Sequence, residues 1–146
     1  MTMLQQPSEQ GTAPEGITIV IVEDDFSNAQ VLEMLLQTEP FYRVISFSTG
    51  REVLQHLEEG KAPRPDLFII DYHLRHMLGL DLYDQLCAIE GLEQVPAILI
   101  TADTVTEDIL LDAVKHEHLQ LIYKPYDIDD LLAAIRQATA QDPQAA

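Results

Sequence analysis

The stretch ITIVIVEDD, residues 17–25, decides the fold class, because an unbroken β-branched run of six residues leads straight into three carboxylates. A run of this kind predicts a strand that is buried on both faces, which is typical of a parallel sheet covered by helices. Apolar residues at helical spacing follow directly and predict a helix over residues 25–37. They are Ala29, Leu32, Leu35 and Leu36.

The alternation of an apolar run with a helical pattern continues along the chain. Further strands are expected at residues 42–47, 67–70, 97–100 and 119–123. Further helices are expected at residues 50–59, 80–89, 107–115 and 127–138. Strands that alternate regularly with helices predict an α/β fold, here a doubly wound (βα)5 flavodoxin-like three-layer sandwich with parallel strand order 2-1-3-4-5. The run at 42–47 is less apolar than the others, so we expect it at an edge of the sheet.

The length of 146 residues is typical of one domain. We expect a flexible polar leader at residues 1–16, one domain at residues 17–139 and a short tail at residues 140–146. The leader lacks the basic start and apolar stretch of a signal peptide, and no apolar run approaches the roughly 20 residues of a membrane span. Cys87 is the only cysteine, which rules out an intramolecular disulfide and fits a cytoplasmic protein.

The charge balance and the absence of several motifs exclude some functions. There are 25 acidic and 8 basic residues, a formal net charge of −17. Such a surface repels phosphate backbones and anionic lipid, so we expect no binding to nucleic acid or membrane. The sequence has no Gly-rich dinucleotide fingerprint after the first strand, no phosphate loop of the GxxxxGK[ST] type and no GxSxG nucleophile elbow.

Polar residues follow four of the predicted strands, and the predicted order brings those strand ends together at one edge of the sheet. They are Glu23, Asp24 and Asp25, then Asp71, Thr101 and Lys124. Crowded carboxylates bind a proton or a hard cation such as Mg²⁺, and one of them can act as a nucleophile. Lysine and threonine can stabilise phosphoryl oxygens. Singly, each residue is more often a cap or a turn residue, as we expect for Asp25, but together they indicate phosphoryl transfer.

The sequence resembles the receiver domain of response regulators over about residues 17–138. The resemblance is carried by IVIVEDD (19–25), FIIDYHL (68–74), GLDL (79–82), ILITAD (98–103) and YKPYD (123–127). It implies a chemotaxis-regulator-like, single-domain response regulator of a two-component system. In such a protein a phosphoryl group passes from a phosphohistidine, on a sensor histidine kinase or a phosphotransfer protein, to an aspartate, and the aspartyl phosphate is later hydrolysed.

The resemblance also implies a role for each matching position. Asp71 would be phosphorylated, with Thr101 and Lys124 as its catalytic partners. Mg²⁺, for which Mn²⁺ can substitute, would be held by Glu23, Asp24, Asp71 and the backbone carbonyl of His73. Ala102 and Asp103 would lie beside the phosphoryl group, and Lys124–Pro125 would be a cis peptide.

The sequence departs from the family pattern at two positions in particular. Leu121 occupies the switch position that is usually aromatic, and Arg75-His76-Met77-Leu78 replaces a loop that usually contains proline. We hypothesise that His73 and Asp103 tune the lifetime of the aspartyl phosphate.

We expect output through contact with an unknown downstream protein, and a monomer or weak dimer. One alternative is a non-phosphorylated pseudo-receiver that serves as an interaction scaffold, and another is a phosphate sink in a phosphorelay. A phosphatase with an aspartate nucleophile would need a second aspartate where His73 stands, and His73 with His76 is weak support for a transition-metal site.

Overall fold

The sheet has the predicted order. The structure, a computed structural model, describes residues 16–102, 111 and 115–140. Its five parallel strands lie in the order β2-β1-β3-β4-β5. The strands are β1 (Ile17–Val22), β2 (Tyr42–Phe47), β3 (Leu67–Asp71), β4 (Ala97–Thr101) and β5 (Leu119–Tyr123). The flavodoxin-like fold is therefore confirmed, and the run at 42–47 lies at an edge, as predicted.

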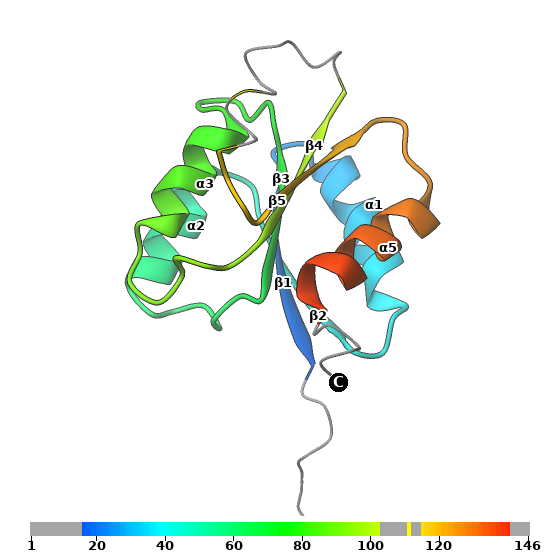
Figure 1. Cartoon of the computed structure of the whole chain (residues 1–146), viewed down its shortest axis with the longest axis horizontal. Coiled ribbons are helices and arrows are strands. Elements are labelled where there is room, and N and C mark those ends of the chain that lie inside the picture. The colour runs from blue at the N-terminus through cyan, green and yellow to red at the C-terminus, as the bar shows by residue number, and fades with distance from the viewer. Residues whose placement is uncertain (1–15, 103–110, 112–114, 141–146) are drawn as a thin grey trace, which may run out of the picture.

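Helices cover both faces of this sheet and complete the three-layer sandwich (Figure 1). The described helices are α1 (Phe26–Gln37), α2 (Gly50–Glu58), α3 (Gly79–Cys87) and α5 (Ile128–Thr139). Helices α2 and α3 lie on one face of the sheet and α1 and α5 on the other (Figure 1). The helix predicted at 107–115 falls almost entirely outside the described residues. No helix in the described part of the chain has the length and apolar character needed to cross a membrane.

Successive residues of each strand point to opposite faces of the sheet and pack into two separate cores, one on each face. Val20 and Val22 of β1 pack under α2 and α3, whereas Ile19 and Ile21 pack under α1 and α5. All four side chains have no exposed surface, which confirms that β1 is buried on both faces. This two-sided burial is why the sequence of β1 shows no polar alternation.

One of the apolar residues that predict α1 does not lie in the core. Leu32 and Leu36 are buried, but Leu35 is 37% exposed. Leu32 and Leu36 are one helical turn apart and face the sheet together, so Leu35 lies about 100° around the helix from Leu36. The helix begins where the sequence predicts, because the Asp25 carboxylate accepts a hydrogen bond of 2.9 Å from the Asn28 N–H.

Candidate functional site

The strand ends bring the predicted polar residues to one edge of the sheet. Val22, the last residue of β1, pairs in register with Ile70 of β3, so Glu23 and Asp71 follow at the same level. On the other side of β3, Asp71 pairs with Ile100, the neighbour of Thr101. The Lys124 N–H then donates a hydrogen bond of 2.8 Å to the carbonyl of Thr101. Residues at the ends of four strands therefore meet at this edge, although Glu23 and Lys124 are 101 positions apart in the sequence.

Three carboxylates gather at the centre of this edge. Glu23, Asp24 and Asp71 each offer a carboxylate oxygen, and these oxygens lie within 4.8 Å of one another. Glu23 is buried, with 8% of its surface exposed, and the other two are half-buried. An all-oxygen, anionic donor set of this kind fits a hard divalent cation such as Mg²⁺, which prefers carboxylate ligands and retains some of its waters.

The electrostatics of the cluster are unfavourable without a cation. The pKa of Glu23 is raised to about 7, chiefly by burial, and the charge of Asp71 contributes to this rise. A hydrogen bond of 3.0 Å from the Asp25 N–H to Glu23 Oε2 and the positive charge of Lys124 act in the opposite direction. Glu23 is thus held close to its protonation midpoint at neutral pH, because repulsion and desolvation disfavour a third negative charge.

The loop after Asp71 is held in place by hydrogen bonds, one of them to the Asp71 carboxylate. The His73 N–H donates a hydrogen bond of 3.1 Å to Asp71 Oδ1. The Gly79 N–H donates to the carbonyl of Tyr72 at 2.6 Å, and His73 forms an antiparallel bridge with Leu78. The loop is therefore closed at its base directly beside the Asp71 carboxylate, with the His73 backbone at the edge of the carboxylate cluster.

A cleft of about 620 Å³, which we call the strand-end cleft, opens between this cluster and α1. Its lining includes Glu23, Asn28, Ala102, Lys124 and Tyr126. Thr101 is 2% exposed, and Lys124 makes no ion pair with any carboxylate in the described part of the chain. The Lys124–Pro125 peptide is cis, as the resemblance implies. Asp103 lies outside the described residues.

Two aromatic residues and one leucine lie near Lys124, in or beside the sheet edge. Tyr126 was not predicted as a site residue, yet it is half-buried in the strand-end cleft, and burial followed by the charge of Glu23 raises its pKa. Its position two residues after Lys124 was the only available signal. Leu121, at the expected switch position, is half-buried and packs against the core under α2 and α3, whereas Tyr123 is 48% exposed.

The glycine that begins α3 is required by its closeness to Asp71. A Cβ atom on Gly79 would lie 2.5 Å from the Asp71 carbonyl oxygen and 3.0 Å from the Tyr72 Cα, and these backbone atoms cannot move freely. We expect Gly79→Ala to lower the free energy of unfolding by about 1–3 kcal/mol, measured by urea denaturation.

Gly50→Ala is the matched control, because Gly50 begins α2 as Gly79 begins α3. There the nearest atom to an added Cβ is Met77 Sδ, at 2.5 Å, which is the far end of a flexible side chain. We therefore expect a smaller loss for Gly50→Ala. Equal losses for the two variants would show that the Asp71 backbone does not set the requirement for glycine.

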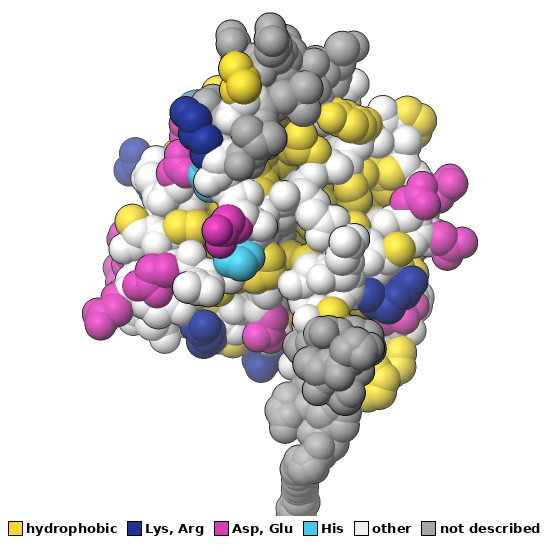
Figure 2. Space-filling view, in the orientation of Figure 1, with side chains coloured by type: hydrophobic (Ala, Val, Ile, Leu, Met, Phe, Trp, Pro, Cys, Tyr) yellow, Lys and Arg dark blue, Asp and Glu magenta, His cyan; other side chains and the backbone are white. Residues whose placement is uncertain are grey.

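Acidic side chains are spread over the face of the molecule seen in Figure 2, and hydrophobic side chains are exposed toward its upper part. The exposed hydrophobic residues of α1 include Phe26, at 77%, Met34, at 62%, and Val31, at 55%. Val31 also lines the strand-end cleft. The polar cluster is therefore bordered on the α1 side by apolar surface.

Comparison with known proteins gives a family for this arrangement. The model of the response regulator receiver domain matches residues 19–136. The transcriptional regulatory protein CitT of Halalkalibacterium halodurans is 38% identical over 114 residues, which cover 69% of this chain and 48% of CitT. The chain spans about half the length of the curated relatives that it matches.

Solved structures agree with the family match. The signal receiver domain of an HD domain-containing protein from Pseudomonas fluorescens Pf-5 is 28% identical, with a TM-score of 0.71, and the match covers 85% of this chain and 94% of that one. A CheY-like receiver domain protein from Methanospirillum hungatei JF-1, at 22% identity, shares the fold with a TM-score of 0.74 over 90% of this chain and 100% of that one. Since the family model covers most of the sequence, the chain belongs to the response regulator receiver domain family.

Proposed function

We propose that the chain accepts a phosphoryl group from a phosphohistidine onto Asp71 in a Mg²⁺-dependent reaction. The observation that carries this proposal is the cluster of Glu23, Asp24 and Asp71, with carboxylate oxygens within 4.8 Å of one another. The cluster lies at the strand ends beside Lys124 and the buried Thr101. The donor would be a sensor histidine kinase or a histidine phosphotransfer protein, in the cytoplasm.

The transfer is a substitution at phosphorus. A carboxylate oxygen of Asp71 forms the new P–O bond, the P–N bond of the phosphohistidine breaks, and its electron pair stays on the imidazole nitrogen. Attack by water on phosphorus later releases phosphate and restores the Asp71 carboxylate. The transferred group carries its charge on three oxygens, which the Lys124 ammonium and the Thr101 hydroxyl would stabilise.

The remaining residues of the site would bind the cation and make room for the phosphoryl group. Glu23, Asp24, Asp71 and the backbone carbonyl of His73 would hold Mg²⁺, which supplies neutralisation of charge on the phosphoryl oxygens. Mn²⁺, which also takes oxygen ligands, would substitute. Ala102 is exposed in the strand-end cleft, and its small side chain would leave space for the incoming group.

The direct test is to incubate the protein with Mg²⁺ and acetyl phosphate and to record its intact mass. We expect a phosphoryl adduct that depends on Mg²⁺. If neither acetyl phosphate nor a phosphohistidine donor gives an adduct, the scaffold alternative is favoured. A phosphate sink would give the adduct and also return the group to the donor, which the same measurement detects on the donor protein.

The output would pass through contact with a downstream protein, and we propose that the chain is a monomer or a weak dimer. Light scattering after size exclusion tests the association state. A stable dimer of the unphosphorylated protein would contradict this part of the proposal.

We expect His73→Ala to lengthen the lifetime of the aspartyl phosphate by about tenfold, which is about 1.4 kcal/mol in the hydrolysis barrier. His73 is exposed, and its backbone N–H donates to Asp71 Oδ1, so His73 lies beside the proposed phosphorylation site. Its imidazole would orient or deprotonate the attacking water. The measurement is the decay of the adduct after the phosphodonor is removed. His76→Ala, in the same exposed loop, is the control, and Asp103→Ala tests the other residue assigned to this effect. An unchanged lifetime in both His73→Ala and Asp103→Ala would show that neither residue tunes hydrolysis of the aspartyl phosphate.

A further inference from the structure

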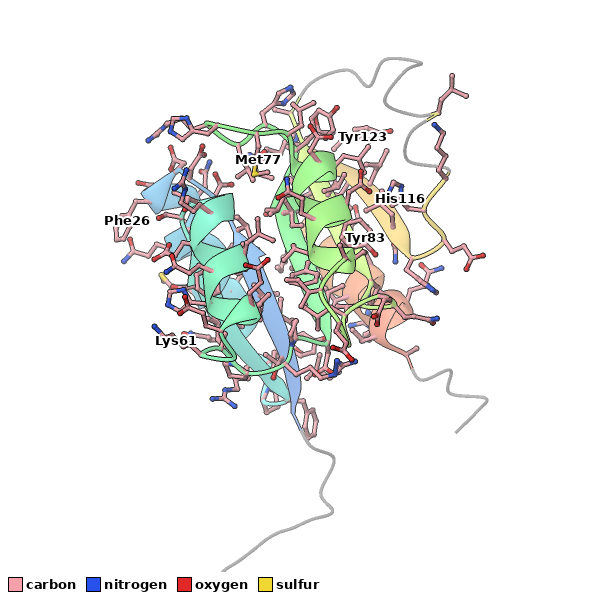
Figure 3. The ribbon with its side chains drawn as sticks, turned by 90° about the vertical axis from the view of Figure 1, so that its left-hand side faces the viewer. Phe26, Lys61, Met77, Tyr83, His116 and Tyr123 are labelled. Atoms are coloured by element: carbon pink, nitrogen blue, oxygen red, sulfur yellow. The ribbon has the colours of Figure 1, made fainter. Side chains whose placement is uncertain are left out.

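A second cleft, of about 700 Å³, lies on the other side of the sheet from α1. We call it the α2 cleft, because α2 forms one wall and the loop between β3 and α3 forms the other. Its lining includes Gly50, Arg51 and Leu54 from α2 and Leu74, Arg75 and Met77 from the loop. Figure 3 shows α2 and α3 beside one another on this face, with Met77 at their upper end. None of these residues belongs to the phosphoryl site.

The floor of the α2 cleft is apolar and closely packed. Met77 lies so close to Gly50 that a Cβ atom there would be 2.5 Å from Met77 Sδ. Leu74 is 9% exposed, and Leu54 and Met77 are half-buried against the core under α2 and α3. The floor can therefore receive an apolar side chain without a change in the core beneath it.

The rim of the α2 cleft is basic, which is unusual on a chain with 25 acidic and 8 basic residues. Arg51 and Arg75 both line it and are exposed, and His76 lies next to Arg75. Within the described residues, neither arginine has an ion pair or a hydrogen bond. Glu58 is the only acidic residue among the described residues of the lining.

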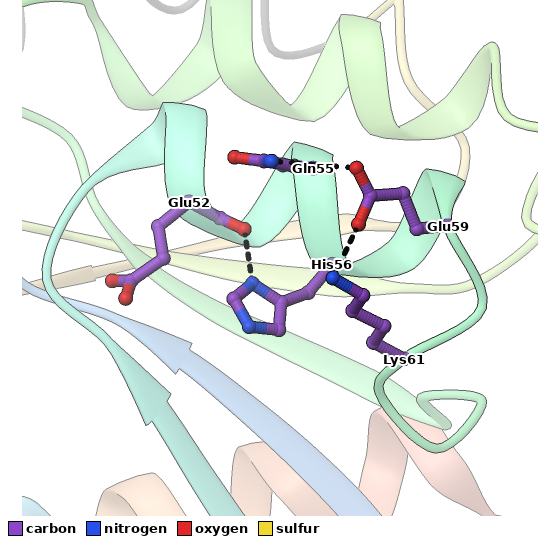
Figure 4. A network of polar contacts seen from close by, with 5 residues as sticks. All are labelled: Glu52, Gln55, His56, Glu59 and Lys61. Carbon is purple, nitrogen blue, oxygen red and sulfur yellow. Dashed lines mark hydrogen bonds and ion pairs between the residues drawn. The ribbon is translucent and has the colours of Figure 1, made fainter.

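Apart from Glu58, the charged and polar side chains of α2 and its C-terminal turn are bound to other groups and do not pair with these arginines. Glu59 forms an ion pair of 2.9 Å with Lys61 and accepts a hydrogen bond of 3.3 Å from Gln55 (Figure 4). The ring of His56 contacts the Glu52 carbonyl at 2.9 Å (Figure 4). The Glu52 carboxylate accepts a hydrogen bond of 3.3 Å from the Ser48 N–H. The positive charge of Arg51 and Arg75 is thus available to a partner.

We propose that the α2 cleft binds an acidic segment of a partner protein. An apolar side chain of that segment lies on the floor formed by Leu54, Leu74 and Met77, and its carboxylates bind Arg51 and Arg75. A guanidinium matches a carboxylate in a two-pronged geometry, and arginine and methionine are enriched in protein interfaces. Sites for small molecules contain few polar groups, whereas eight of the twelve described residues that line the α2 cleft are polar or charged.

This assignment goes beyond the proposed phosphoryl transfer and does not depend on it. The α2 cleft and the strand-end cleft lie on opposite sides of the sheet, and they share no lining residue. Binding to the α2 cleft can therefore be measured on the unphosphorylated protein without Mg²⁺.

Methionine methyl groups give a direct test, because Met77 lines the α2 cleft and Met34 is 62% exposed on α1. The full chain is labelled with methyl-¹³C methionine and titrated with a capped peptide of sequence Glu-Leu-Glu-Glu-Leu-Glu. We expect a saturable shift of the Met77 resonance and none of the Met34 resonance. In the double variant R51Q/R75Q we expect binding to weaken by about tenfold or more.

Three controls separate recognition from general charge effects. The double variant R43Q/R136Q removes the same charge from exposed positions outside the cleft, and we expect it to bind as the unmodified protein does. A peptide with Gln in place of Glu and a hexaglutamate without leucine should each bind much more weakly. The proposal is overturned if Met77 does not shift, if the Gln peptide binds equally well, or if R43Q/R136Q weakens binding as much as R51Q/R75Q. An unchanged Met34 resonance shows that each variant is folded.

Discussion

Asp71→Asn is expected to abolish the phosphoryl adduct, with a loss of rate on the order of 10³-fold or more. The amide has no anionic oxygen to attack phosphorus, so the loss falls on the chemical step. The amide oxygen can still accept the hydrogen bond from the His73 N–H, and the variant removes a negative charge beside Glu23. We therefore expect the variant to be folded and at least as stable as the unmodified protein without Mg²⁺. The measurement is intact mass over time with Mg²⁺ and acetyl phosphate.

Asp25→Asn is the matched control for this experiment. Asp25 belongs to the same acidic run but caps α1, and asparagine caps a helix as well as aspartate does. The control removes one negative charge near the site and should retain the adduct. An adduct that survives in Asp71→Asn but is lost in Asp25→Asn would place the phosphorylated carboxylate elsewhere in the site.

Strand order and strand ends could be predicted because local sequence determines them. The β-branched run of β1 must be buried on both faces, and the right-handed connections of a parallel sheet then restrict the order of the other strands. Once that order is known, the residues at the C-terminal ends of β1, β3, β4 and β5 are brought to one edge. The sequence alone therefore places four residues together, namely Glu23, Asp71, Thr101 and Lys124.

Features that depend on side-chain packing between distant segments could not be predicted. Nothing local distinguishes Leu35 from Leu36, and only the orientation of α1 on the sheet exposes Leu35. The contact of His116 Nε2 with Asp84 Oδ1, at 2.6 Å, joins segments 32 positions apart. The α2 cleft likewise depends on the packing of Met77 against Gly50, which are far apart in the sequence.

Glu23→Gln is expected to stabilise the protein without Mg²⁺ at pH 8 by about 1–3 kcal/mol and to leave its stability nearly unchanged at pH 4. In the folded protein the pKa of Glu23 is raised from 4.5 to about 7, chiefly by burial. The folded state thus holds this proton more tightly than the unfolded state does. The contribution of Glu23 to stability is fully present below about pH 4.5 and is lost as the pH rises through 7. Glutamine is uncharged at every pH and avoids that loss.

With Mg²⁺ at pH 8, we expect the unmodified protein to be more stable than Glu23→Gln, the reverse of the order without Mg²⁺. A cation bound only to the folded state stabilises it by about 2.7 kcal/mol at a hundred times its dissociation constant. We expect the unmodified protein to show a gain of this kind, and Glu23→Gln to lose most of it because one anionic oxygen ligand is gone. Urea denaturation at pH 4 and pH 8, with EDTA or Mg²⁺, gives four free energies of unfolding for each protein, and Glu90→Gln serves as an exposed control. If Glu23→Gln is no more stable than the unmodified protein in EDTA at pH 8, the buried carboxylate is not repelled as the geometry implies. If Mg²⁺ stabilises both proteins equally, Glu23 takes no part in holding the cation.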